Sequence, residues 1–355
     1  MMKNKTTLPP DNCVYCNAEC QDLRYHSRYQ TLDGTRIVFR CLVCRKTFND
    51  RFGTAFYDLK TPSKKVSRAI QQVAEGLSFE AVARIEGVAP ETVSEWVKRG
   101  SEQAALIDSE VVQDVDTEIV EMDEVYSFAG HKQNRDEADD LLTETGKHWT
   151  HCSFARATRL ILAIKIGFRD ELVTNELVIE TASRLSKDCF PLWVTDGWKA
   201  YIFALAVRFH QKIYQIRRRG RGRPPIPKMI PAPYLRYAQV IKQREQGRVV
   251  GIEKRVIFGK EEEINPKDII TSHLERLNGT MRLHCTPLHR KTRCFAKKKT
   301  QLEQQVTLFK SYYNFCLRHE SLDYQTPAQA TGLIDKPLTM MELLSYGGLK
   351  FSKIS

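Results

Sequence analysis

One acidic residue, Glu275, stands alone among eight lysines and arginines in residues 271–300. Basic side chains at this density are suited to holding phosphate groups, so a single carboxylate among them indicates a second requirement, such as a cation. Helical spacing in "SHLERLNGTMRLH" places Glu275, Asn278 and Arg282 at positions i, i+3 and i+7. The three side chains are therefore expected on one face of a helix.

Two aspartates occupy positions where strands are expected to end. Asp123 lies in the apolar and acidic run "EIVEMDEVYSF", and Asp196 comes just after the apolar "PLWV". Aspartate is a poor strand residue, and open sheets form their clefts at strand ends, so both positions favour chemistry over folding. Together with Glu275 they would form a three-acid cluster able to hold two hard cations roughly 4 Å apart, as phosphoryl transfer requires. Each acid taken alone is also compatible with a turn or a surface charge.

The third acid of this cluster has competitors. Between Asp196 and Glu275 lie 78 residues, which include Glu253 and the acidic run 261–263. Glu275 is the best placed because its surroundings are basic, and the others remain alternatives.

Four cysteines near the N-terminus have the spacing of a structural zinc site. Cys13 and Cys16 form one C-x2-C pair, and Cys41 and Cys44 form another, with 24 residues between the pairs. Two such pairs that face each other close a tetrahedral Zn²⁺ site, and the intervening sequence predicts a hairpin with its turn at Asp33-Gly34. We therefore expect a zinc ribbon over residues 1–60.

Helical periodicity replaces strand alternation from Ser63 to about Ala105. Gly76 and Gly87 are suited to ending helices, and Pro90 to beginning one. A small shared core is expected from Val82, Ile85, Val88, Val93, Trp96 and Val97.

We interpret residues 61–112 as a helix-turn-helix DNA-binding domain, because a zinc ribbon directly precedes it. The outward-facing Thr92, Ser94 and Lys98 would contact DNA. The alternative is a three-helix packing unit that never touches a duplex.

The order of expected strands and helices in residues 113–335 predicts a single α/β domain with a mixed sheet. Strands are expected in residues 117–128, 151–158, 160–168 and from residue 191, with a helix at 170–187. A Pro-, Gly- and Arg-rich segment at about 212–265 interrupts the pattern and is interpreted as an insertion or flexible arm. Residues 336–355 are expected to form a C-terminal tail.

Composition limits the kind of partner. The 355 residues carry 55 Lys+Arg against 43 Asp+Glu, a formal charge of +12, which favours a polyanionic partner. Apolar runs such as "LILAIKIGF" are interrupted by lysine well short of a bilayer span, and the N-terminus has no signal-peptide core. We expect a cytoplasmic protein that has no membrane partner and is associated with the nucleoid through DNA.

The segment "RRRGRGRPPIPK" contains Arg221 and Arg223 on either side of a glycine. An extended backbone could direct both guanidinium groups into a narrow A·T-rich minor groove. A basic linker that contacts phosphates without sequence preference is an equal alternative.

Three motifs together resemble a known family. "EMDEVYSFAG", "WVTDGWKAY" and "HLERLNGTMR", in this order behind a zinc ribbon and a helix-turn-helix, resemble the transposases of the insertion-sequence-one family over roughly residues 13 to 335. The resemblance implies a ribonuclease-H-like catalytic domain with an acidic triad, which falls on Asp123, Asp196 and Glu275.

The same resemblance implies the chemistry. Two Mg²⁺ or Mn²⁺ ions at the acidic triad would serve hydrolysis and then transesterification of DNA, without a covalent enzyme intermediate. Asn278 and Arg282 would support the scissile phosphate. The partners would be the terminal inverted repeats and target DNA, and joining two DNA ends implies a homo-oligomer.

Two other functions stay open. "HLER" also supplies the H-x-x-R pattern of tyrosine recombinases, with Tyr312 or Tyr313 as nucleophile, although the two aspartates would then have no role. A noncatalytic DNA-binding regulator derived from a transposase is the third interpretation.

Overall fold

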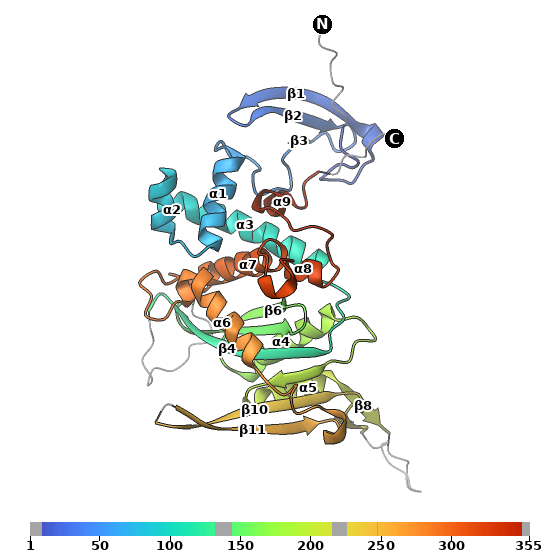
Figure 1. The fold of residues 1–355 in the computed structure, drawn as a ribbon. Helices are drawn as coiled ribbons and strands as arrows, with labels where there is room; N and C mark the ends of the chain where they lie inside the picture. Colours follow the sequence, from blue (N-terminus) through green and yellow to red (C-terminus); the bar gives the residue numbers. More distant parts are fainter. Residues whose placement is uncertain (1–8, 132–143, 215–225, 247, 350–355) are drawn as a thin grey trace. The chain divides into compact units, whose positions relative to one another are not determined.

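A computed structural model describes residues 9–131, 144–214, 226–246 and 248–349 (Figure 1). The chain forms two compact units. The N-terminal unit comprises Met1–Ser109 together with Leu338–Ser355, and the central unit comprises Glu110–Pro337.

The N-terminal unit begins with a small antiparallel sheet. The 3-10 helix η1 (Cys20–Asp22) leads into β1 (Leu23–Thr31), β2 (Gly34–Cys41) and β3 (Thr47–Asn49). Thr31 pairs with Gly34, so the hairpin turn is Leu32–Asp33, one residue earlier than the sequence predicted. Gly34 has φ 97°, a backbone conformation that glycine adopts without steric cost.

Three helices follow: α1 (Ser63–Ala74), α2 (Phe79–Glu86) and α3 (Pro90–Val111). The side chain of Ser78 caps α2, and Gly87 ends it in the left-handed conformation. The predicted placement of Ile85 in the core is wrong, because its side chain is 59% exposed. Glu86 is buried instead and accepts hydrogen bonds from Arg68 at 2.8 and 2.6 Å. The short helix α9 (Met340–Ser345) packs against α1 and completes this unit.

The central unit contains a mixed six-stranded sheet, which confirms the α/β class predicted from the sequence. Its strand order is β11-β10-β7-β4-β5-β6. The antiparallel strands β4 (Ile119–Ala129), β5 (Gly146–Ala155) and β6 (Leu160–Gly167) form a meander. On the other side of β4 lie β7 (Leu192–Thr195) and β10 (Arg236–Glu245), both parallel to it, and then β11 (Arg248–Phe258), antiparallel to β10.

The segment predicted as an insertion contributes to this sheet. Residues 236–245 form β10 and residues 248–258 form β11, whereas β8 (His210–Ile213) and β9 (Lys228–Pro231) pair as a separate two-stranded ribbon. Charged residues are frequent along β11, "RVVGIEKRVIF", and hide the apolar alternation that marks a strand. Arg221 and Arg223 lie outside the described residues.

Helices cover both faces of the sheet. The face that carries Val125 packs against α6 (Ser272–His284) and α7 (Lys299–Phe315), and the opposite face packs against α4 (Glu171–Arg184) and α5 (Ala200–Arg208). Short helices complete the unit: η2 (Glu261–Glu263), η3 (Thr286–Leu288), η4 (Glu320–Leu322) and α8 (Pro327–Ala330).

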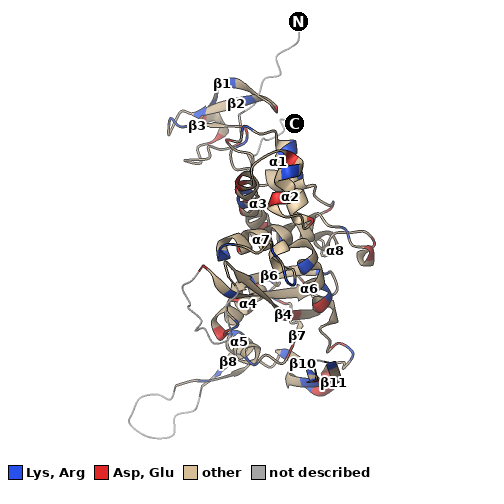
Figure 2. Cartoon of the chain, turned by 90° about the vertical axis from the view of Figure 1, so that its left-hand side faces the viewer, with Lys and Arg blue, Asp and Glu red and all other residues tan. Residues whose placement is uncertain are grey.

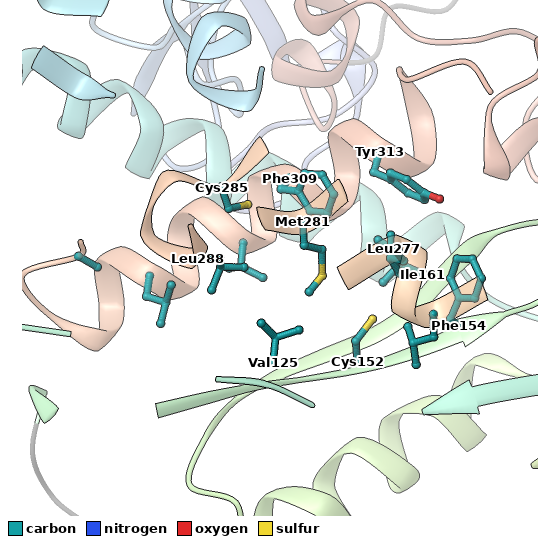
Figure 3. Close-up of a cluster of buried hydrophobic side chains, with 14 residues drawn as sticks. Val125, Cys152, Phe154, Ile161, Leu277, Met281, Cys285, Leu288, Phe309 and Tyr313 are labelled. Carbon is teal, nitrogen blue, oxygen red and sulfur yellow. The ribbon is translucent and has the colours of Figure 1, made fainter. Parts of the chain in front are cut away.

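Figure 3 shows the core between the sheet and helices α6 and α7. Val125 and Cys152 on the strands meet Met281 on α6 and Phe309 on α7, all nearly inaccessible to solvent. This packing fixes α6 against β4, the two elements that carry candidate site residues.

Among the described residues, no helix combines the length and apolar character needed to cross a bilayer.

Candidate active site

Strand register brings the two predicted aspartates together. Asp196 directly follows β7, but the expected strand-end position of Asp123 is wrong, because the apolar run continues and Asp123 lies in the middle of β4. In the parallel pair of β4 and β7, Met122 lies opposite Thr195, so the next residues, Asp123 and Asp196, are neighbours across the strands. One carboxylate oxygen from each of them lies within 4.8 Å of a carboxylate oxygen of Glu124. Such a group of oxygen ligands fits a hard divalent cation.

Each aspartate is held by a defined hydrogen bond. Asn278 on α6 donates from Nδ2 to Oδ2 of Asp123 at 2.8 Å. Asp196 accepts a bond from the backbone amide of Trp198 at 2.8 Å through Oδ1, and one from Arg169 at 3.2 Å through Oδ2. Both carboxylates are thus oriented by the protein, which favours preorganised metal binding.

Glu275 lines the same cavity, of about 590 Å³, as the two aspartates. Its carboxylate accepts a hydrogen bond from Thr271 Oγ1 at 2.8 Å and pairs with the Lys242 ammonium, so it stands apart from the group of three close carboxylates. Asn278 and Arg282 also line this cavity, as expected for three residues on one face of α6. Among the alternative third acids, Glu253 is on β11 and pairs with Arg255, and the acidic run Glu261–Glu263 forms η2. None of them lines the cavity.

The close carboxylates perturb one another. Burial is the main cause that raises the pKa of Asp123 to about 6, and the charges of Asp196 and Glu275 add to it. Burial and the charge of Asp196 likewise raise the pKa of Glu124 to about 7. Glu275 differs: burial opposes the shift, but hydrogen bonds from Lys242 and Thr271 hold its pKa below the usual range. A cation between Asp123 and Asp196 would relieve their repulsion.

Sequence reasoning missed Glu124 and the residues around it. Glu124 is buried on the sheet face opposite Asp123, and the hydroxyl of the buried Tyr201 donates to it at 2.5 Å. Arg169 donates to both Glu124, at 3.1 Å, and Asp196, at 3.2 Å. The guanidinium lies over the rings of Trp149 and Trp198, 5.2 and 4.6 Å from their centroids. The available signal was a second acid directly after Asp123 in "MDE".

A second acid on β4, Glu121, fixes the start of α6. It is inaccessible to solvent and accepts hydrogen bonds from the backbone amide of Leu274 at 2.9 Å and from His273 Nδ1 at 3.2 Å. Arg156 donates to the same carboxylate at 2.6 Å and also bonds the carbonyls of Asp268 and Ile270. A negative charge at a helix N-terminus is favourable, so β4 sets the position of the helix that carries Glu275.

Basic side chains form the wall of the acidic cavity. Lys242 and Arg244 come from β10, and Arg282 and Arg290 come from α6 and the loop after η3. Figure 2 shows lysines and arginines on α6, β10 and β11 of this unit. Acids from the middle of β4 and from the end of β7, with bases around them, suit the binding of a metal ion together with a phosphate group.

The four N-terminal cysteines converge as their spacing predicted. Cys13 and Cys44 have Sγ atoms 3.7 Å apart, Cys16 and Cys41 have Sγ atoms 3.6 Å apart, and all four lie within 4.8 Å of one another. Sulfurs at about 2.3 Å from a tetrahedral zinc ion lie about 3.8 Å from each other, so the geometry fits Zn²⁺.

The residues predicted to contact DNA lie on α3. Lys98 is exposed, and Thr92 and Ser94 are half-buried. Their role in DNA binding stays a prediction.

The residues of the H-x-x-R pattern line a different cavity, of about 410 Å³. His273 and Arg276 lie there with Arg159, His319 and the ring of Tyr313, and no residue is shared with the acidic cavity. Tyr312 is buried and does not line it.

No family model and no curated protein matches the sequence. Among solved structures, the chain is similar to a Mos1 transposase paired-end complex with the left transposon end (TM-score 0.19, 9% identity, 42% of this chain and 56% of that chain). It is also similar to the Mos1 strand transfer complex (TM-score 0.18, 11% identity, 42% and 54%). The chain thus spans about half the length of these structures.

Proposed function

We propose that this chain is a DNA transposase, which binds the ends of a mobile element and carries out metal-dependent strand cleavage and strand transfer. The observation that carries the proposal is the pair of neighbouring carboxylates, Asp123 and Asp196, inside a cavity with a basic wall. Carboxylates in such proximity are costly without a cation, and the surrounding bases fit a polyanionic substrate.

The fold supports a ribonuclease-H-like assignment for the central unit. An antiparallel meander of three strands is continued by two strands parallel to the first, and this order brings Asp123, in the middle of β4, beside Asp196, which directly follows β7. The order of the motifs resembles the insertion-sequence-one transposases, in which Asp123, Asp196 and Glu275 would form the triad.

Individual residues have separate tasks under this proposal. Asp123 and Asp196 would hold the divalent cations, Mg²⁺ or Mn²⁺, which when bound supply Lewis-acid activation of water or a 3′-hydroxyl and stabilisation of the leaving oxygen. Glu275 would complete the ligand set after its carboxylate turns away from Lys242. Asn278 keeps Asp123 in place, and Arg282, on the same face of α6, would contact the phosphate.

The N-terminal unit would supply DNA binding. Its cysteine cluster would hold one structural Zn²⁺, and α3 would present Lys98 to the duplex. Transfer of two ends to a target would require a homo-oligomer.

A labelled DNA fragment from the end of the element tests the proposal. With Mg²⁺, Asp196→Asn and Glu275→Gln should each lose at least about a hundredfold in cleavage rate, because metal ligation needs the negative charge. DNA affinity measured on the same fragment should change little. Glu253→Gln, which removes a similar charge outside the cavity, should cleave at the wild-type rate.

Wild-type rates in Asp196→Asn would remove the aspartate from the site. A severe defect in Glu253→Gln with normal cleavage by Glu275→Gln would move the third acid to β11.

A further inference from the structure

We propose that the cavity behind α6, lined by Arg159, Arg276 and His319, binds a backbone phosphate of the DNA. This inference rests on the proposed function for the identity of the ligand. It assigns no catalytic role to the cavity and adds a contact separate from the acidic site.

Helix α6 separates the two cavities. Glu275, Asn278 and Arg282 line the acidic one, whereas His273, Arg276, Leu277 and Thr280 line the other. A helix is about 10 Å across, so both cavities lie within reach of one DNA molecule that crosses α6.

The second cavity holds two guanidinium groups without partners. Among the described residues, neither Arg159 nor Arg276 makes a side-chain hydrogen bond or ion pair, whereas His273 is hydrogen-bonded to Glu121. The acidic residue in the lining, Glu320, is exposed. Two unpaired arginines facing one concave site match the geometry of a phosphate, which guanidinium groups bind through paired hydrogen bonds.

A buried polar atom also indicates a ligand in this cavity. His319 Nε2 is buried without a hydrogen-bond partner, and an unmade bond to a buried polar atom is costly. Burial and the charges of Arg159 and Arg276 lower the pKa of His319 to about 4, so the ring is neutral at pH 7 and Nε2 can donate when it carries the proton.

Tyr313 gives the cavity the residue types of a tyrosine recombinase, but its placement favours binding over covalent catalysis. The side chain is 3% exposed, and its ring packs against His319 at 4.6 Å between centroids. Burial raises the pKa of the phenol, which disfavours the phenolate needed for attack.

The test uses the full-length protein and a fluorescent DNA duplex, in Ca²⁺ in place of Mg²⁺. The affinity is measured by anisotropy at several salt concentrations for wild type, Arg159→Gln, Arg276→Gln and the double variant. We expect each single change to reduce the slope of log affinity against log salt by about one, and the double change by about two. The matched control is Arg318→Gln, since Arg318 is exposed, precedes His319 and does not line the cavity. It should keep the wild-type slope.

Several results would overturn the inference. One is an unchanged slope in the double variant, provided its melting temperature equals that of wild type. Another is an equal loss in Arg318→Gln, which would show a diffuse charge effect. A third is that inorganic phosphate raises the melting temperature of wild type but not of the double variant, while the double variant binds DNA as wild type does. The cavity would then be a site for a free anion.

A covalent protein–DNA adduct that Tyr313→Phe abolishes would also overturn it, because the cavity would then be catalytic. If wild-type protein does not cleave the DNA with Mg²⁺ but the variants show the expected change of slope, the proposed function is contradicted and this binding site stays in place.

Discussion

At the scale of single residues, the acidic cavity is held together at an energetic cost. Asp123 and Glu124 have pKa values raised to about 6 and about 7, because burial and the nearby Asp196 disfavour their charged forms. Arg169 offsets part of this repulsion through its bonds to Glu124 and Asp196. Carboxylates kept under such conditions indicate a role in binding a cation, since an apolar or amide side chain would stabilise the fold more.

Asp123→Asn should therefore stabilise the protein without added divalent ions. The folded-state pKa of about 6 exceeds the unfolded value of 3.8, so the native state binds more protons, and the wild-type free energy of unfolding falls as pH rises through this window. At pH 8 the variant should be more stable by about 1 to 3 kcal/mol, and at pH 4 the two should be equal.

Urea unfolding followed by tryptophan fluorescence measures this difference, because Trp149, Trp193 and Trp198 lie in the central unit. Asp188→Asn, which changes an exposed aspartate, is the control and should show no such pH dependence. A variant less stable than wild type at pH 8 would contradict the claim that the buried charge of Asp123 destabilises the folded protein.

At the scale of elements, β4 organises the site. Its residues alternate between faces, so Glu121 and Asp123 face α6 while Glu124 faces α5. Glu121 ties the strand to the N-terminus of α6, and Asn278 ties the helix back to Asp123. The placement of Glu275 on α6 thus depends on the bonds that Glu121 and Asp123 make with this helix.

Glu121→Gln should disturb this link. The change leaves Arg156 without its buried carboxylate partner, which costs about 2 to 4 kcal/mol of stability. Because α6 would then be less firmly placed, cleavage should slow by about tenfold or more even where the variant is fully folded. Glu118→Gln, an exposed glutamate just before β4, should change neither the melting temperature nor the rate. Wild-type cleavage by a folded Glu121→Gln protein would show that α6 is positioned by other contacts.

Local patterns predicted many elements but not all. The strands β4 and β6 and the helix α4, capped by Asp170, could be located because apolar periodicity and capping residues are local signals. The strand β11 could not, because its charged residues conceal its alternation. Ile85 was wrongly placed in a core, because spacing alone does not show that Glu86 is buried instead, where it accepts hydrogen bonds from Arg68 and Gln72.

Site residues divide in the same way. Asp196 could be proposed from a strand end and Glu275 from helix spacing, whereas Asp123 was proposed from an expected strand end although it lies in the middle of β4. The link from Arg169 to Asp196 and the bond from Tyr201 to Glu124 could not, because each joins residues distant in sequence that only the packing of helices on the sheet brings together.

At the scale of the whole molecule, the chain forms two compact units. The N-terminal unit includes Leu338–Ser355, and within it Leu344 accepts a hydrogen bond from the backbone of Ala55 at 3.0 Å. From the sequence, residues 336–355 were predicted to be only a tail, because a local pattern cannot reveal contacts with residues nearly 300 positions earlier in the chain. This unit is small, and its cysteine cluster is expected to supply much of its stability through Zn²⁺.

Removal of zinc should therefore act on one unit. Full-length protein should contain one zinc ion per chain, and Cys41→Ser should lose it together with the cooperative unfolding of the N-terminal unit. Cys294→Ser, which replaces an exposed cysteine outside the cluster, should keep both. Metal analysis by mass spectrometry and calorimetric melting measure these quantities. Full zinc content in Cys41→Ser would remove this cysteine from the ligand set.

The central claim, that Asp196 is a ligand of the cation used for DNA cleavage, is tested most directly by changing the ligand and the metal together. Asp196→Cys should be inactive on the labelled element end with Mg²⁺, which prefers oxygen ligands, and should regain cleavage by about tenfold or more with Mn²⁺, which accepts sulfur more readily. Asp188→Cys should cleave with either ion. Cleavage by Asp196→Cys at the wild-type rate with Mg²⁺ would contradict the account, because the carboxylate would then not be needed to hold the metal.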